Sequence, residues 1–186
     1  MSFGGGGSNP GFLQQLANGI MPSQGYAAPE VQQFINQVPP QQFQQYAQQG
    51  ISQTAPQDYS NHITPGVGGT NPLGGLGSGV LGNLAGSLMG HLMGGQGNSS
   101  GMTNSMGMQT TDPQQMNEQD VSQMAQYAHQ HNPGALANTA AQYQNKPDVV
   151  QAVLGNKALT IALGGLAAAA MAGKLPGVTP KFGPGA

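Results

Sequence analysis

The side chains of this chain that are best suited to bind a metal are the histidines His129 and His131, which are separated by one residue. Imidazole nitrogen is the commonest protein ligand for metal ions. Residues two positions apart on a helix lie on nearly opposite faces, so the pair cannot hold one ion while this segment is helical. The chain has no cysteine, and no third ligand is spaced to help. The sequence therefore predicts no metal site and no cofactor.

Two glycine-containing motifs match known functional patterns by form only. Residues 77–82, GSGVLG, match the dinucleotide-binding pattern G-x-G-x-x-G, which requires a preceding strand and an acidic residue about twenty positions later. TNPLGGL precedes the motif instead, and no acidic residue occurs between Asp58 and Asp112. Residues 97–101, GNSSG, match the nucleophile-elbow pattern G-x-S-x-G but lie in a stretch too rich in glycine and serine for the required strand. We interpret both as chance matches.

The acidic residues form no catalytic arrangement. Most of them fall in or before the first turn of an expected helix, where the helix dipole favours negative charge. The six acidic residues are Glu30, Asp58, Asp112, Glu118, Asp120 and Asp148. Neither a pair of carboxylates nor a nucleophile beside a base can be recognised. The sequence therefore predicts a non-enzymatic protein with no evident small-molecule substrate.

The spacing that does suggest a role belongs to small residues. Gly82, Gly86, Gly90 and Gly94 recur every fourth residue within residues 78–94, SGVLGNLAGSLMGHLMG. In a helix this spacing places the glycines on one face, where another backbone can approach closely, as in the small-xxx-small interfaces of membrane helices. A second segment, residues 156–173, repeats the pattern less regularly. The predicted helix-packing interface consists of Gly82, Gly86, Gly90, Gly94, Gly165, Ala169 and Gly173.

The segments that carry these residues are expected to be helical. The sequence predicts a mainly α fold with two small helical hairpins interrupted by prolines, two glycine- and alanine-rich apolar helices, flexible glycine-rich linkers and partly disordered termini. The expected order is a leader with a short helix (1–28), a hairpin (29–63), a linker (64–77), the glycine-zipper helix (78–94), a linker (95–116), a second hairpin (117–155), the apolar helix (156–173) and an extended tail (174–186).

The two halves of the chain have the same order of parts, a hairpin followed by a small-residue helix, and either a duplication or similar composition alone explains this likeness. In both cases we expect the two small-residue helices to pack closely, against each other or against copies of the chain.

Composition narrows the classes of partner. Leu, Ile, Val and Phe make up about 18% of the residues, near the low values of disordered chains, but only 5% of residues are charged and the net charge is −2. Such a chain lacks electrostatic self-repulsion, which favours self-association. It contains four lysines and no arginine, too few cations for nucleic-acid binding, which depends on phosphate neutralisation.

Residues 158–173 contain no charge and would span about 24 Å as a helix, short of a bilayer core of about 30 Å. Lys157 and Lys174 flank the segment and could reach the interfaces, so membrane insertion stays an alternative to burial in a protein core.

Three hypotheses follow. The first is a structural or interaction protein that self-associates through glycine-rich helix faces. The second is a membrane-associated or membrane-penetrating protein that uses the two apolar helices, and the third is a low-complexity stress protectant. The N-terminus has no basic region followed by an apolar run, so we expect no secretory signal peptide. A cytoplasmic, peripheral-membrane or non-classically exported location is consistent with that.

Overall fold

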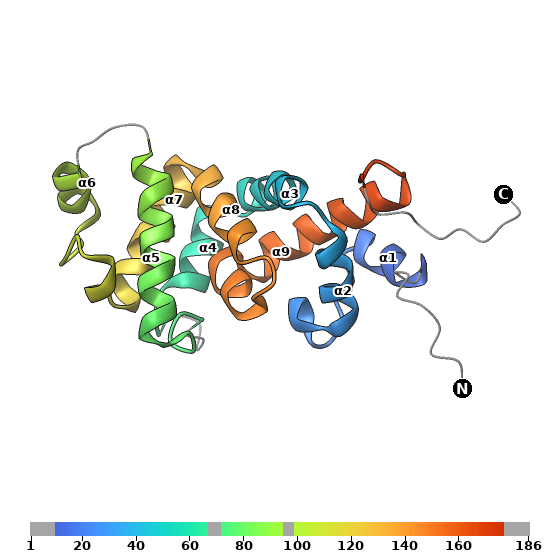
Figure 1. Cartoon of the computed structure of the whole chain (residues 1–186), viewed down its shortest axis with the longest axis horizontal. Coiled ribbons are helices and arrows are strands. Elements are labelled where there is room, and N and C mark those ends of the chain that lie inside the picture. The colour runs from blue at the N-terminus through green and yellow to red at the C-terminus, as the bar shows by residue number, and fades with distance from the viewer. Residues whose placement is uncertain (1–9, 67–71, 95–98, 177–186) are drawn as a thin grey trace, which may run out of the picture.

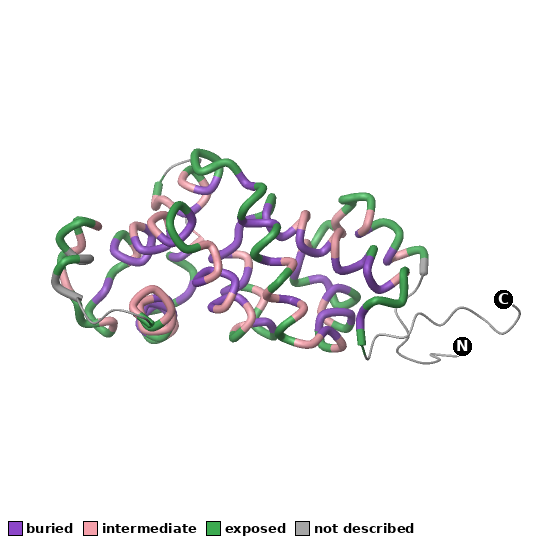
Figure 2. Tube along the Cα trace, turned by 90° about the horizontal axis from the view of Figure 1, so that it is seen from above, coloured by how far each residue is buried: buried purple, intermediate pink, exposed green. Residues whose placement is uncertain are grey.

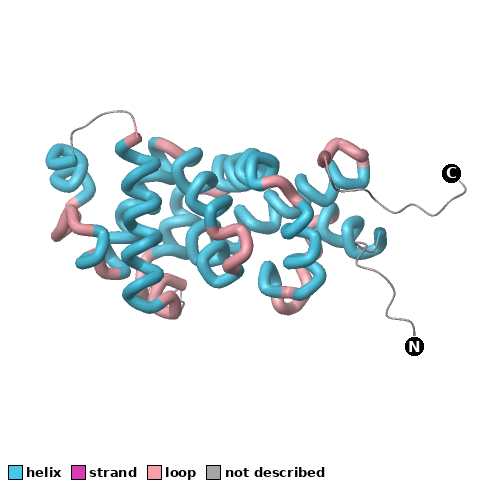
Figure 3. Tube along the Cα trace, viewed as in Figure 1, coloured by secondary structure: helices cyan, strands magenta, loops and turns pink. Residues whose placement is uncertain are grey.

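The computed structural model describes residues 10–66, 72–94 and 99–176, and these residues form nine α-helices and no strand. Figures 1 and 3 show helices arranged along an elongated molecule. The mainly α fold predicted from the sequence is confirmed. In chain order the elements are α1 (Pro10–Ala17), η1 (Gly25–Ala27), α2 (Pro29–Gln37), α3 (Pro40–Gln53), α4 (Pro56–Ile63), α5 (Gly77–Met93), α6 (Ser99–Met106), η2 (Pro113–Gln115), α7 (Glu118–His131), α8 (Pro133–Gln142) and α9 (Pro147–Met171).

Local sequence explains where most of these helices begin. Helices α2, α3, α4, α8 and α9 each carry proline in their first turn, where the missing N–H costs nothing and the fixed φ suits a helix. Helix α7 begins with a capping box: the Asn117 side chain accepts from the backbone N–H of Asp120 at 3.0 Å, and the Asp120 carboxylate accepts from the N–H of Asn117. Asn132 caps α8 in a similar way.

Helix α9 is the central element of the core. It packs against α1, α3, α4, α8 and η1, and its leucines and most of its alanines are buried (Figures 1 and 2). Small residues allow the close approach of its neighbours. A methyl group added at Gly165 would lie 2.6 Å from the ring of Tyr46 in α3, and one added at Gly164 would lie 3.1 Å from the carbonyl oxygen of Leu16 in α1.

Helix α9 is interrupted at Gly155, whose backbone lies in the left-handed region with φ 77° and ψ 161°. Glycine adopts this conformation without the cost that a side chain would impose. Two helical segments therefore meet at this residue. Helix α4 lies against the break: Nε2 of His62 is 3.1 Å from the carbonyl oxygen of Gln151, and the hydroxyl of Tyr59 donates to that of Val153 at 2.7 Å.

Helix α5 belongs to the other end of the molecule. It packs against α7, α8 and η2, and α8 also contacts α9 (Figure 1). The two small-residue helices are therefore not among the main helix–helix contacts of the described residues, and packing against copies of the chain stays a prediction. The physical reason is that α9 uses its small residues to approach α1 and α3, while the leucines of α5 are buried against α7 and α8.

The connecting segments contain more structure than expected. Residues 95–116, predicted to be a flexible linker, include α6 and η2. In the linker 64–77, Leu73 and Leu76 are buried. Helix α1 ends before Ile20, because Gly19 turns the chain with φ 77°, and Ile20 lies exposed. The predictions for residues 1–9, 67–71, 95–98 and 177–186 lie outside the described part of the chain.

Candidate self-association surface

The outward side of α5 carries small residues and no charge. Gly79, Asn83, Gly90 and Gly94 are exposed and Gly86 is half-buried, and we call these five residues the α5 outer face. At about 100° per residue, Gly79, Gly86 and Gly90 lie within roughly 40° of one another, opposite the buried leucines of the same helix. Figure 2 shows α5 end-on at the edge of the molecule, with half-buried and exposed residues around much of its circumference.

The opposite side of α5 holds the helix in this orientation. Leu81, Leu84 and Leu88 are buried, with Leu84 and Leu88 each 1% exposed. One side chain of α8 adds a polar attachment: Gln142 accepts a hydrogen bond from the hydroxyl of Ser87, and its amide nitrogen lies 3.1 Å from Nε2 of His91. The leucine pattern thus determines which side of α5 remains available.

Short helix η2 covers one edge of the glycine pattern. A methyl group added at Gly82 would lie 3.1 Å from the side-chain amide of Gln114, and one added at Gly86 would lie 3.7 Å from Cβ of Pro113. At Gly79 and Gly90, an added methyl group would meet no described heavy atom within 4 Å. Packing within the chain therefore accounts for Gly82, but nothing in the described part of the chain uses the space beside Gly79 and Gly90.

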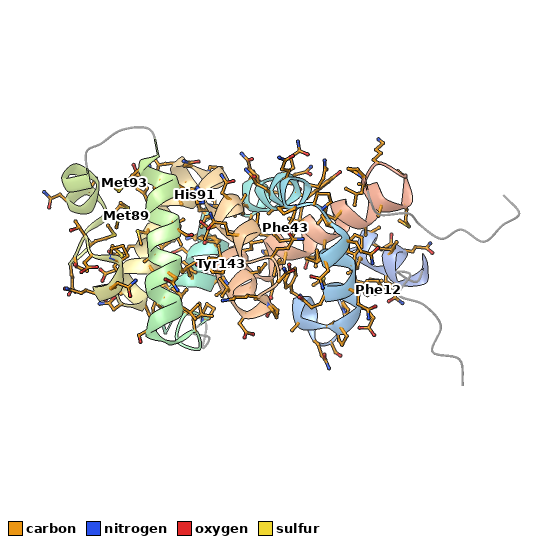
Figure 4. The ribbon with its side chains drawn as sticks, in the orientation of Figure 1. Phe12, Phe43, Met89, His91, Met93 and Tyr143 are labelled. Carbon is orange, nitrogen blue, oxygen red and sulfur yellow. The ribbon has the colours of Figure 1, made fainter. Side chains whose placement is uncertain are left out.

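Adaptable apolar side chains border the outer face. Figure 4 labels Met89 and Met93 on the side of α5 that faces α6, and His91 on the side that faces α8. Both methionines are half-buried. Because methionine is unbranched and flexible, it can adjust its shape to a surface that packs against it.

The other predicted interface residues have different surroundings. Gly165 contacts Tyr46 of α3, and Ala169 is only 6% exposed. Gly173 follows the C-terminus of α9 with φ 69°, where it turns the chain. The structure thus separates the two groups of small residues that the sequence placed together: those of α9 lie within the core or end the helix, and those of α5 lie partly on the surface.

The residues considered for metal binding also separate. The ring of His129 is buried and stacks on Tyr59, while His131 is exposed and stacks on Tyr127, with centroid distances of 4.5 and 4.3 Å. Within the described residues, no group of three or more His, Asp or Glu side chains is placed to hold a metal ion. Residues 77–82 open helix α5 and follow a turn, so the dinucleotide-binding motif lacks its strand.

The polar groups beside the break in α9 were not predicted. A cleft of about 230 Å³ lies between α4 and α9, with Thr54, Asp58, His62 and Lys157 among its lining residues. Lys157 forms an ion pair of 2.7 Å with Asp58, and both side chains are well exposed. Burial raises the pKa of Tyr59 well above its ordinary value, so its hydroxyl stays a hydrogen-bond donor at physiological pH. Residue spacing alone cannot place α4 beside this break.

Comparison with known proteins provides no further assignment. No protein-family model matches the chain, and neither a curated protein nor a solved structure shows a significant match to it.

Proposed function

We propose that this chain is a non-enzymatic structural or interaction protein that self-associates, and that a second copy of the chain packs on the α5 outer face. The observation that supports the proposal is the open space beside Gly79 and Gly90, two exposed helical glycines with no neighbouring heavy atom within 4 Å of an added methyl group. Each interior glycine costs a helix about 1 kcal/mol relative to alanine. Close approach of another chain offsets that cost.

The chemistry of the outer face suits a second copy. No Asp, Glu, Lys or Arg lies between Asp58 and Asp112, so two such faces meet without repulsion between like charges. Helices whose contact residues are small approach to the short end of the usual interaxial range of 8–10 Å. At that separation, backbone Cα–H groups can contact carbonyl oxygens of the facing helix, and Met89 and Met93 can fill the space along one edge. A two-fold axis across the face would place identical glycines opposite each other.

Sedimentation velocity over a micromolar concentration range tests this proposal. We expect the wild-type protein to associate as its concentration rises, and Gly90→Leu to remain monomeric with unchanged helix content. Gly101→Leu is the matched control, because Gly101 is also an exposed helical glycine with no neighbour within 4 Å but lies on α6. A wild-type protein that stays monomeric, or a Gly90→Leu variant that associates as wild type does, would contradict the proposal.

A membrane-associated role is the second candidate, because α9 is the one helix of the described residues that is long and apolar enough to cross a membrane. In the folded chain 61% of the most apolar 18-residue stretch of α9 is buried. Insertion of α9 into a membrane would therefore require α1 and α3 to separate from it. Flotation with neutral phosphatidylcholine vesicles distinguishes the two candidates. A protein that self-associates but does not float with the vesicles supports the self-association role and excludes the membrane-associated role.

A further inference from the structure

One buried titratable side chain has no part in the self-association surface. His129 lies in the last turn of α7, and only 9% of it is exposed. Its ring is stacked on that of Tyr59 in α4, with the ring centroids 4.5 Å apart and the planes at 15°. Helices α4 and α7 pack against each other, and this stack lies in their interface.

The imidazole of His129 is buried without a well-formed hydrogen bond. Neither Nδ1 nor Nε2 forms a hydrogen bond of good geometry with a described residue. A buried polar group without a partner destabilises the folded state. Protonation would add a positive charge to the buried ring, and burying a charge costs more than burying a neutral polar group.

The charged and titratable groups of the surrounding helices are engaged elsewhere. On α4, Asp58 pairs with Lys157 and His62 bonds to backbone carbonyls of α9. On α5, His91 contacts Gln142 of α8. The sequences of α6 and α8 contain no titratable side chain.

The remaining titratable groups lie on α3 and on α7 itself. Tyr46 of α3 packs on Gly165 of α9. In α7, Asp120 belongs to the capping box at the opposite end of the helix from His129, and Glu118 lies in the same first turn. Tyr127 and His131 stack on each other at the exposed end. The carboxylates of α4 and α7 therefore lie in an ion pair with Lys157 or at the opposite end of α7 from His129.

Burial lowers the pKa of His129, and the nearby backbone groups of Ile51 and Thr54 oppose this effect only in part. The folded protein thus binds a proton at His129 less readily than the unfolded chain, whose histidines titrate near their ordinary pKa of about 6.5. The stabilisation from a neutral His129 is complete above about pH 6.5. It is lost progressively as the pH falls toward the lowered pKa.

Helix α4 connects this histidine to the break in α9. The same tyrosine that stacks on His129 donates its hydroxyl hydrogen to the carbonyl oxygen of Val153. One turn later on α4, Nε2 of His62 lies 3.1 and 3.3 Å from the carbonyl oxygens of Gln151 and Ala152.

We propose that His129 is an acid-sensitive switch that holds α4 between α7 and the break in α9, and that its protonation releases α4. Departure of α4 gives the charged ring access to water. It also separates Tyr59 and His62 from the carbonyl groups of α9. Because one proton is taken up on opening, the equilibrium constant for opening rises by up to about tenfold for each pH unit between the unfolded and folded pKa values.

Hydrogen exchange of the full chain, followed by mass spectrometry between pH 7.5 and 5, measures this opening directly. After correction for intrinsic exchange rates, we expect protection of residues 56–63 to fall by up to about tenfold per pH unit below about pH 6.5, while protection of α2 stays unchanged. In His129→Phe, which keeps an aromatic ring against Tyr59, this pH response disappears. His131→Gln, which removes the exposed histidine of the same helix, responds as wild type does.

Three results would overturn the proposal: equal protection of residues 56–63 at both pH values in the wild-type protein, an equal fall of protection in α2 and α4, or a response in His129→Phe that matches wild type. If His129→Phe does not fold, His129→Gln serves the same purpose because glutamine keeps a polar group but does not titrate. The experiment is carried out at a concentration where sedimentation shows one species, so failure of the self-association proposal leaves this test unaffected.

Discussion

The backbone of α3 at Gly50 lies directly against the carbonyl oxygen of Ala158 in α9, leaving no room for a methyl group on Gly50. The contact joins two buried residues and lies where α3 crosses the C-terminal part of α9 just after its break. The closest helix–helix approach through a glycine in the core thus involves a glycine outside both regular small-residue patterns.

Gly50→Ala should lower the free energy of unfolding by about 1–3 kcal/mol, because the added methyl group overlaps backbone atoms that cannot move away without shifting a helix. Urea denaturation followed by circular dichroism measures the change. Gly90→Ala is the matched control, since its added methyl group meets open space and alanine favours the helix by up to about 1 kcal/mol. Equal effects of the two substitutions would show that α3 and α9 are not in contact at Gly50.

Gly165→Ala should lower the free energy of unfolding by about 1 kcal/mol, because the methyl group would lie 2.6 Å from the half-buried ring of Tyr46. A double-mutant cycle with Tyr46→Leu identifies the cause. We expect Gly165→Ala to lower the free energy of unfolding by about 0.5 kcal/mol less, or a still smaller amount, when Tyr46→Leu has removed the ring. Additive effects would indicate that the ring of Tyr46 is not what excludes a methyl group at Gly165.

Tyr59→Phe should lower the free energy of unfolding by about 1–3 kcal/mol, because it removes the buried donor to the carbonyl oxygen of Val153 while keeping the aromatic ring. Tyr127→Phe provides the comparison, as Tyr127 is half-buried on α7. Thermal denaturation at pH 7.5 shows which of the two variants is less stable, and we expect it to be Tyr59→Phe. A Tyr59→Phe variant as stable as wild type would mean that this hydrogen bond contributes nothing to holding α4 on α9.

Gln144→Met should lower the free energy of unfolding by about 1–3 kcal/mol. The buried amide nitrogen of Gln144 donates to the carbonyl oxygens of Ile35 and Val38 at 2.6 and 2.9 Å, and methionine fills similar space without a donor. Gln33→Met, at an exposed position of α2, should change the stability by no more than about 0.5 kcal/mol. Denaturant titration of both variants checks the difference.

Much of the local structure could be predicted because its causes lie within a few residues. Pro40, Pro133 and Pro147 begin helices where proline suits the first turn. The side chains of Asn117 and Asp120 satisfy each other's backbone N–H groups without help from the rest of the chain. The apolar residues of α2 and α7 likewise recur at helical spacing, so the sequence predicts which of their sides is buried.

The surroundings of the small-residue helices could not be predicted in this way. Gly90 and Gly165 occur in patterns that look alike, yet one meets open space and the other meets an aromatic ring from a helix more than a hundred residues earlier in the chain. His129 and His131 are two positions apart, yet one is buried and the other exposed.

By itself, the sequence determined that the chain is mainly α-helical and where most helices begin. Only the tertiary structure decided that α9 lies in the core, that the glycines of α5 are partly exposed, and that α4 packs against the break at Gly155. The reason is physical: helix periodicity and capping are set by neighbours in sequence, whereas the partner of a helix face depends on which distant segments fill the space beside it.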